Sequence, residues 1–240
     1  GLAGHTTEGD GGGGDFWLDT SDTSTADDNG INIVDAVSPR IGTWKRIYEG
    51  AIYTAFYGLD RTAAVNETSA LQAIIDAVPD NSKIIYSPGS YLQSNVNVTS
   101  KINLKIEGYG AKITLEGTSG AESAFELVGT SDQIEIAGFA CIGDGVVANK
   151  HRFIHSSSGQ TLTNLHFHHN NIKDVVQGIS LNTADSTGYL KNVWIHHNGI
   201  ENVYGEAAGE GYGIHFSARN TNASANIIVS NNTLINVQRH

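Results

Sequence analysis

Apolar and polar positions recur with a period of about thirty residues through the second half of the chain. Five ten-residue segments align without gaps, and their starts lie 30, 31, 28 and 34 residues apart. They are residues 104–113, 134–143, 165–174, 193–202 and 227–236. A fixed period of this length is the sequence signature of a fold that stacks repeated units.

The apolar positions within each segment indicate two short strands joined by a fixed turn. Positions one, three and eight are apolar in every copy. Positions one and three point to the same face of an extended strand, so we expect that face to be buried. Position six is asparagine in the last three copies, where stacked side chains are expected to form a hydrogen-bonded ladder. These residues are Asn170, Asn198 and Asn232.

A third apolar strand follows in each period, at residues 124–127, 152–154, 178–181 and 213–216. Three strands per coil of roughly thirty residues predict an all-β fold, a right-handed parallel β-helix. A leucine-rich horseshoe is excluded, because its Leu-x-x-Leu-x-Leu pattern is absent.

The first hundred residues follow other patterns. Residues 66–78 are amphipathic with helical spacing, and Ser69 and Gln72 suggest a capping box. Before them lies a glycine run at 11–14, which is interpreted as a flexible linker or turn, and an Asn29-Gly30 hairpin signal. We therefore predict a glycine-rich β module at 1–50, a capping helix and the start of the β-helix at 51–99, and the β-helix at 100–240.

Composition narrows the partners. The chain has 240 residues and a net charge of −11, which disfavours nucleic acid and anionic membranes. No apolar run is long enough to cross a bilayer, so no membrane insertion is expected. The single cysteine, Cys141, lies in an apolar run and is expected to be a core residue.

Residues 57–92 resemble the first part of pectate-lyase-like β-helix proteins. The shared features are Tyr57-Gly58, the amphipathic segment 68–77 and the strand and Pro-Gly turn at 84–92. In that family an amphipathic helix caps the open end of the coil stack. Residues 59–62 depart from the Gly-Asp-Gly and Asp-Asp loop of the family.

Residues 9–50 resemble the glycine-rich module that precedes the β-helix in phage tailspikes and capsule depolymerases. The matching elements are the glycine run with Phe16, the turn at 27–30 and residues 42–46. The resemblance implies a homotrimeric spike on the virion that acts at the bacterial cell surface. It also implies attachment to a phage baseplate or adaptor protein through the N-terminal module, and cleavage of glycosidic bonds in a surface polysaccharide, capsule or O-antigen.

Three functions stay open at this point. The first is such a depolymerase, hydrolase or lyase, with its active site here or beyond residue 240. The second is a non-catalytic adhesin or a structural, virion-proximal part of the spike. The third is a secreted bacterial pectate-lyase-like enzyme. The chain stops within a coil without a polar cap, which suggests a longer spike.

An insertion that lengthens one coil holds the densest group of polar side chains. Glu206 and Glu210 are candidate catalytic acids or bases, because paired carboxylates cleave glycosides. His215 is a candidate proton shuttle, Tyr212 a sugar-stacking platform and Arg219 an anion clamp. The alternative is a solvated loop with acidic tips, which in general is the commoner case.

Outward side chains on the strands complete the predicted set. Trp194 and Tyr204 are candidate sugar-binding aromatics, and Trp194 and Ile154 are expected to offer apolar surface to a trimer interface. Asp174 and Glu201 are an alternative acid pair, although turn hydrogen bonds explain Asp174 as well. Histidines at 166, 168, 169, 196 and 197 should stack in register as a polar ladder. Neither a metal nor another cofactor is expected.

Overall fold

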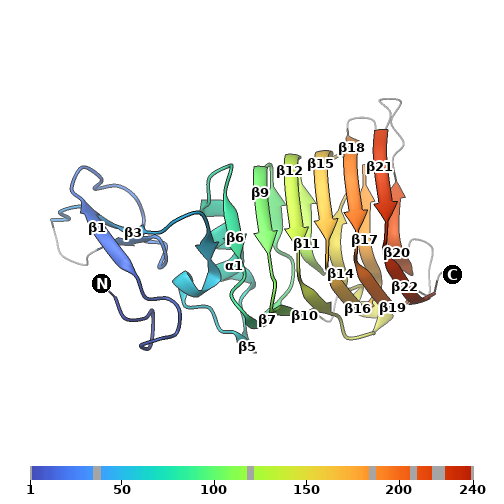
Figure 1. The fold of residues 1–240 in the computed structure, drawn as a ribbon, viewed down its shortest axis with the longest axis horizontal. Helices are drawn as coiled ribbons and strands as arrows, with labels where there is room; N and C mark the ends of the chain where they lie inside the picture. The colour runs from blue at the N-terminus through green and yellow to red at the C-terminus, as the bar shows by residue number, and fades with distance from the viewer. Residues whose placement is uncertain are drawn as a thin grey trace.

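The computed structural model describes residues 2–34, 39–117, 122–183, 188–205, 210–217 and 225–238. A small antiparallel module at the N-terminal end leads into a stack of parallel coils that extends to the C-terminal end (Figure 1). A short helix lies at the start of the stack (Figure 1). The predicted parallel β-helix with a small β module and a helix in front of it is confirmed.

Three parallel sheets run along the coil stack in the described part of the chain. The first sheet contains β4 (Ile52–Tyr53), β6 (Lys83–Ile85), β9 (Ile102–Glu107), β12 (Thr130–Ala137), β15 (Thr161–His168), β18 (Tyr189–His196) and β21 (Ala225–Ser230). The second sheet contains β5 (Thr62–Asn66), β7 (Gly89–Gln93), β10 (Ala111–Leu115), β13 (Ala140–Ile142), β16 (Asn171–Val175), β19 (Gly199–Val203) and β22 (Thr233–Val237). The third sheet contains β8 (Asn97–Thr99), β11 (Ser123–Val128), β14 (Arg152–Ser156), β17 (Gln177–Asn182) and β20 (Tyr212–Ser217).

The core runs along the axis of the stack, where apolar side chains of all three sheets meet. Ile136, Phe167 and Ile195 occupy the same repeat position in three coils and are fully buried. Val229 continues this row in register but is 47% exposed, because no described strand packs beyond β21. Cys141 is buried, which raises the pKa of its thiol and makes it a poor nucleophile.

The turns between the first and second sheets explain the asparagine pattern. Asn170 Nδ2 donates to Asn198 Oδ1 at 3.0 Å, and Asn198 Nδ2 donates to Asn232 Oδ1 at 2.9 Å. The preceding residue has positive φ in each turn, 55° at His169 and at His197. The predicted ladder is therefore present, and each turn needs only two residues between its strands.

The N-terminal module is an antiparallel sheet of β1 (Asp15–Asp19), β3 (Thr43–Ile47) and β2 (Asn32–Val34), in that order. Arg46 is buried and donates to the carbonyl oxygens of Gly12, Gly13 and Gly30. The glycine run is thus a packed turn, and the interpretation as a flexible linker is wrong. A Cβ at Gly12 would lie 2.7 Å from the carbonyl oxygen of Ala55, so the close approach requires glycine.

One detail at the start of the coil stack, the N-terminal cap of its helix, differs from expectation. Helix α1 (Thr68–Ala77) buries Leu71, as its apolar spacing predicts, but it has no side-chain capping bond. The predicted capping box is wrong because Gln72 instead donates to Asn97 O of the third sheet at 3.0 Å.

Two short 3-10 helices, η1 (Thr54–Tyr57) and η2 (Val147–Asn149), lie in connections. No described helix is long and apolar enough to span a membrane.

Candidate functional site

The outer face of the third sheet carries one continuous row of polar side chains. In register along the stack, the row runs from Glu126 through His155 and Ser180 to His215. Long connections enter this sheet, nine residues between β13 and β14 and eight between β19 and β20. Loops held by a rigid scaffold are where binding and catalytic groups concentrate.

Glu126 is a half-buried carboxylate held by several donors. Its Oε2 lies 3.2 Å from His155 Nδ1, and its Oε1 accepts from Ser157 Oγ at 2.9 Å. Burial raises the pKa of Glu126, but the ion pair with His155, with smaller contributions from the serine hydroxyls, holds it below its usual range. Glu126 is therefore ionised at neutral pH and can act as a base or a nucleophile.

Arg152 adds a positive charge that interacts electrostatically with Glu126 and Glu210. Burial lowers the pKa of its guanidinium, and the charges of Glu126 and Glu210 oppose that shift. Its Nε is buried and has no hydrogen-bond partner among the described residues. Glu210 is itself buried and lies 3.4 Å from Lys150 Nζ. Glu210 is thus a buried carboxylate paired with Lys150, and not a solvated loop tip.

Tyr212 and His215 form a stacked pair at the C-terminal end of the face. Their ring centroids lie 4.3 Å apart with planes 13° from parallel. His215 Nδ1 lies 3.1 Å from Ser180 Oγ, which is buried and so fixes the imidazole plane. Tyr212 is in register with Gln177 and Arg152, three residues before His215 on the same strand. The structure therefore brings the predicted residues Glu210, Tyr212 and His215 to one face.

The other predicted residues have different surroundings. Glu206 and Arg219 lie outside the described residues. Tyr204 donates from its hydroxyl to Asp174 Oδ1 at 3.3 Å, at the turn before the third sheet. Trp194 lies on the first sheet, on a different face from Glu210.

The structure also differs from the predictions of an acid pair at Asp174 and Glu201 and of an exposed apolar side chain at Ile154. Asp174 lies near the end of β16, has φ of 56° and accepts from Asn202 Nδ2 at 3.0 Å, so its carboxylate is held in a structural hydrogen bond. Glu201 pairs with Lys173 at 2.6 Å. Ile154 is fully buried, and its predicted exposure is wrong because it pairs in register with core residues while His155 points outward.

Glu126, Arg152 and His155 were not among the sequence candidates. Their signal was present in the third strand of each coil, because Glu126, His155 and His215 stand at equivalent positions. Aligning the third strands as strictly as the first and second would have shown a polar row amid apolar neighbours.

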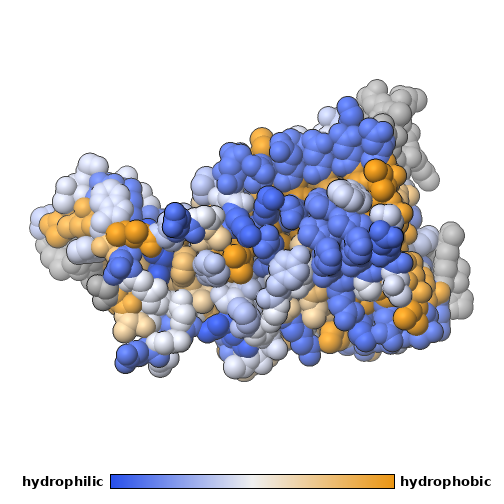
Figure 2. Space-filling view, viewed as in Figure 1, coloured by the Kyte–Doolittle hydropathy of each residue, from blue (hydrophilic) through white to orange (hydrophobic). Residues whose placement is uncertain are grey.

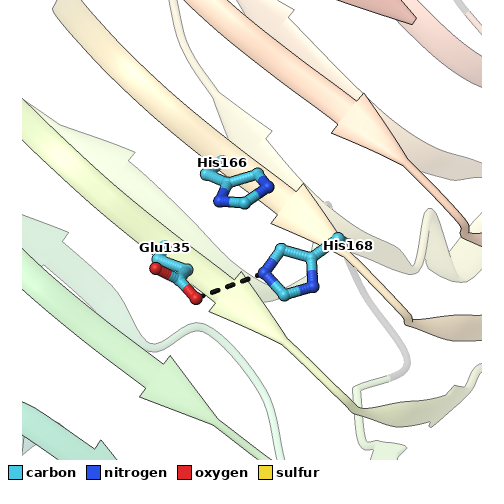
Figure 3. A group of neighbouring side chains, drawn as sticks. All are labelled: Glu135, His166 and His168. Carbon is cyan, nitrogen blue, oxygen red and sulfur yellow. Dashed lines mark hydrogen bonds and ion pairs between the residues drawn. The ribbon is translucent and has the colours of Figure 1, made fainter. Parts of the chain in front are cut away.

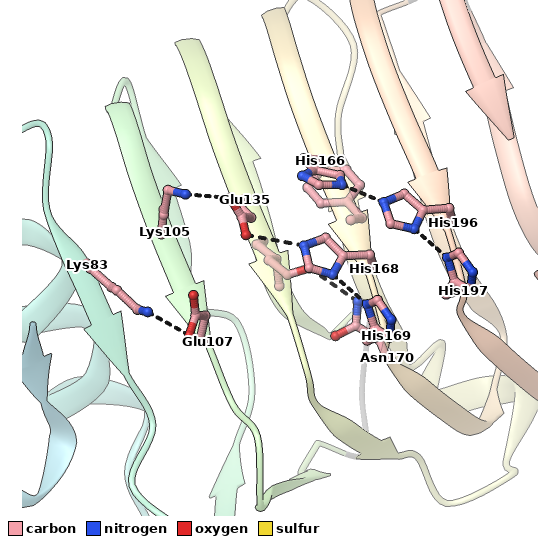
Figure 4. Close-up of polar contacts among 12 residues, drawn as sticks. Lys83, Lys105, Glu107, Glu135, His166, His168, His169, Asn170, His196 and His197 are labelled. Carbon is pink, nitrogen blue, oxygen red and sulfur yellow. Dashed lines mark hydrogen bonds and ion pairs between the residues drawn. The ribbon is translucent and has the colours of Figure 1, made fainter. Parts of the chain in front are cut away.

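The outer face of the first sheet carries a second polar array (Figure 4). Lys105, Glu135, His166 and Trp194 follow one another in register, and His168 and His196 form the next row. His168 stacks on His196 at 5.1 Å and 4°, as predicted. Burial, followed by the neighbouring imidazoles, lowers the pKa of His196 to about 4. Glu135, His166 and His168 lie close enough together to hold a metal ion (Figure 3).

Shallow grooves cross this second array. One, of about 370 Å³, is lined by Trp194, Ile228, His166 and the asparagines at 164, 192 and 226. A smaller one, of about 190 Å³, continues past Glu135 and Lys105. The side of the β-helix seen in Figure 2 is largely hydrophilic. Trp194 and Ile228 in the first groove are exposed apolar residues.

The N-terminal module is similar to a known sequence family, and the fold is similar to solved structures over most of the chain. Residues 1–49 match the family described as phage tail protein small four-stranded beta-sheet domain. The fold is similar to that of full-length tailspike protein 2 from an Escherichia coli O157:H7 bacteriophage, with a TM-score of 0.53 and 13% identity, over 86% of this chain and 32% of that one. The chain has the fold of a phage tailspike.

Two further solved structures are similar. The enzymatically active domain of tailspike protein 2 of bacteriophage CBA120 has a TM-score of 0.52 and 12% identity, over 86% of this chain and 35% of that one. A tailspike of an Acinetobacter baumannii phage, AM24, has a TM-score of 0.47 and 15% identity, over 94% of this chain and 50% of that one. The chain spans about a third of the length of tailspike protein 2. No curated protein sequence matches it.

Proposed function

We propose that this chain is the N-terminal part of a phage tailspike that binds a bacterial surface polysaccharide and cleaves its glycosidic bonds. The observation that carries the proposal is the pair of Glu126 and His155, 3.2 Å apart, in register with Ser180 and His215 on the loop-bordered face of the third sheet. The phage tail domain at residues 1–49 and the likeness to an enzymatically active tailspike domain support it.

The residues of this face suit cleavage of an acidic or neutral glycan. Glu126, ionised and oriented by His155, is the proposed base or nucleophile. His215 lies three strands further along the sheet, about 14 Å away at the usual strand spacing, so it is proposed as a sugar ligand with Tyr212 stacked on it. The same residues could serve a hydrolase or a lyase, and the chemical nature of the product distinguishes the two reactions.

The test is incubation of the full-length spike with capsules and lipopolysaccharides of candidate hosts. New reducing ends indicate hydrolysis, and ultraviolet absorbance from an unsaturated uronate indicates elimination. Cleavage that disappears in Glu126→Gln supports the proposal. Polysaccharide binding without cleavage by the wild-type spike would instead support an adhesin.

The remaining parts of the proposal concern assembly. The N-terminal module is proposed to attach the spike to a baseplate or adaptor protein of the virion, and the native spike is proposed to be a homotrimer. Exposed Trp194 and Ile228, in register on neighbouring strands, are the apolar surface that a second copy would cover. Light scattering of the full-length spike gives its mass, and a monomer mass contradicts the trimer.

A further inference from the structure

The histidines of the first sheet converge with a carboxylate in a way that a polar ladder does not require. One nitrogen from each of His166 and His168 and one oxygen of Glu135 lie within 4.8 Å of one another. The two histidines are two residues apart on β15, so both point outward, and Glu135 is in register with His166 on β12. Figure 3 shows the three side chains grouped over these two strands.

The distances suit a small divalent cation. Zn²⁺ bonds of about 2.0–2.2 Å place tetrahedral N and O ligands roughly 3.3 Å apart. His168 Nε2 already lies 3.2 Å from Glu135 Oε1. The other oxygen of Glu135 is 3.0 Å from Lys105 Nζ, which orients the carboxylate and leaves Oε1 directed at the histidines. The array therefore offers ligands at the required spacing on a rigid pair of strands.

The hydrogen bonds around the group occupy one ring nitrogen of each proposed ligand histidine, and the partner in each is another imidazole. His168 Nδ1 lies 2.8 Å from His169 Nδ1, and His166 Nε2 lies 2.6 Å from His196 Nε2. His196 Nδ1 in turn lies 2.7 Å from His197 Nδ1 (Figure 4). Each pair needs one donor and one acceptor. If His166 donates from Nε2 and His168 from Nδ1, their other nitrogens are left deprotonated, as metal ligands must be.

We propose that Glu135, His166 and His168 bind one divalent transition-metal ion per chain, with Zn²⁺ the best match to this mixed imidazole and carboxylate set. His169 and His196 fix the tautomers of the two ligating rings, and Lys105 fixes the carboxylate. The fourth position faces solvent and accepts water. The site lies on the first sheet, so it is independent of the cleavage proposed for the third sheet.

The experiment measures metal binding and not activity. The full-length spike, with its purification tag removed, is dialysed against a chelator and titrated with Zn²⁺ by calorimetry. Co²⁺ titration followed by visible absorption reports the coordination geometry. One equivalent per chain is expected. His168→Ala, which places there the residue that Ala137 supplies one coil earlier, should abolish that binding. Glu135→Gln should weaken it by more than the roughly 10–100-fold typical of an outer-shell change.

Two further variants make the outcome decisive. His169→Asn keeps a residue that tolerates positive φ, as Asn231 does in a later turn, and should weaken binding about 10–100-fold. His155→Gln removes a histidine that also faces a glutamate but belongs to no such group among the described residues, and should leave affinity unchanged. The site is overturned if the wild type shows no saturable binding. It is also overturned if Glu135→Gln and His168→Ala both bind with the affinity of the wild type. If His168→Ala fails to fold by circular dichroism, Glu135→Gln and His166→Gln decide.

Discussion

The junction between the first and second sheets differs from the junctions that enclose the third sheet. The former spans two residues in each of the last three coils, whereas the connections into the third sheet span nine, one and eight residues in three successive coils. A turn of constant length keeps every side chain in register, so identical residues stack into ladders such as Asn170 to Asn232. Connections of variable length bring unlike groups together.

The contents of the two outer faces follow from this difference. Next to the constant turns, similar side chains stack from coil to coil, as His168 on His196 and His169 on His197 do. The third sheet gains Glu210 and Lys150 from two of its long connections, and they pair next to Arg152. Evolution can change such loops without shifting the coils, which makes this face the natural place for a specific site.

The largest expected effect is on the third sheet. Glu126→Gln removes the proposed base while keeping its shape, so kcat should fall by about 10²–10⁴-fold. Glu107→Gln is the matched control, because Glu107 also pairs with a cation, Lys83 at 2.8 Å, but on the first sheet. Initial rates on the cleaved polysaccharide are the measurement. Equal rates in the two variants would remove Glu126 from the mechanism.

The ladder should show the next largest effect, on stability. Asn198 is buried and donates to Asn232 Oδ1 and to the carbonyl oxygen of Phe167. Asn198→Ala removes the donor to Phe167 O and the oxygen that accepts from the backbone N and Nδ2 of Asn170, which should lower the free energy of unfolding by about 1–3 kcal/mol. Lys191→Ala, an exposed change on the preceding strand, should stay within about 0.5 kcal/mol. Denaturant unfolding of the full-length spike compares the two.

This contrast also explains how much the sequence could predict. The coils, their buried positions and the ladder follow from a periodic pattern, since each position repeats the same environment. Glu210, Tyr212 and His215 were found because an insertion broke the period. Glu126 and Arg152 were missed because their partners come from neighbouring coils and a loop, about thirty to sixty residues away in sequence. Ile154 was misplaced because the alternation of its strand was taken one residue out of phase.

A smaller effect is expected in the pH dependence of the same face. A glutamate whose pKa is lower in the folded state than its value of about 4.3 in the unfolded state stabilises the fold above about pH 4.3. That stabilisation is lost as the pH falls through the pKa of the folded state. His155→Gln removes the side chain that lowers the pKa of Glu126 most. The burial of Glu126, which raises its pKa, is unchanged. The acidic limb of the kcat/KM profile should therefore move to higher pH. An unchanged limb would show that Glu126 does not control it.

The smallest effect is expected at Trp194, which tests whether the first sheet also contacts the glycan. Its indole is 47% exposed, stacks on His166 at 4.9 Å and lines the groove of about 370 Å³. An exposed ring contributes little to folding, so Trp194→Ala should change the free energy of unfolding by less than about 1 kcal/mol. If the ring only holds the polysaccharide, KM should rise by up to about tenfold at unchanged kcat, because uniform binding is lost. If Trp194 instead lies between subunits, KM stays constant and the mass by light scattering falls. A fall in kcat alone would place the chemistry on the first sheet and reverse the assignment of the two faces.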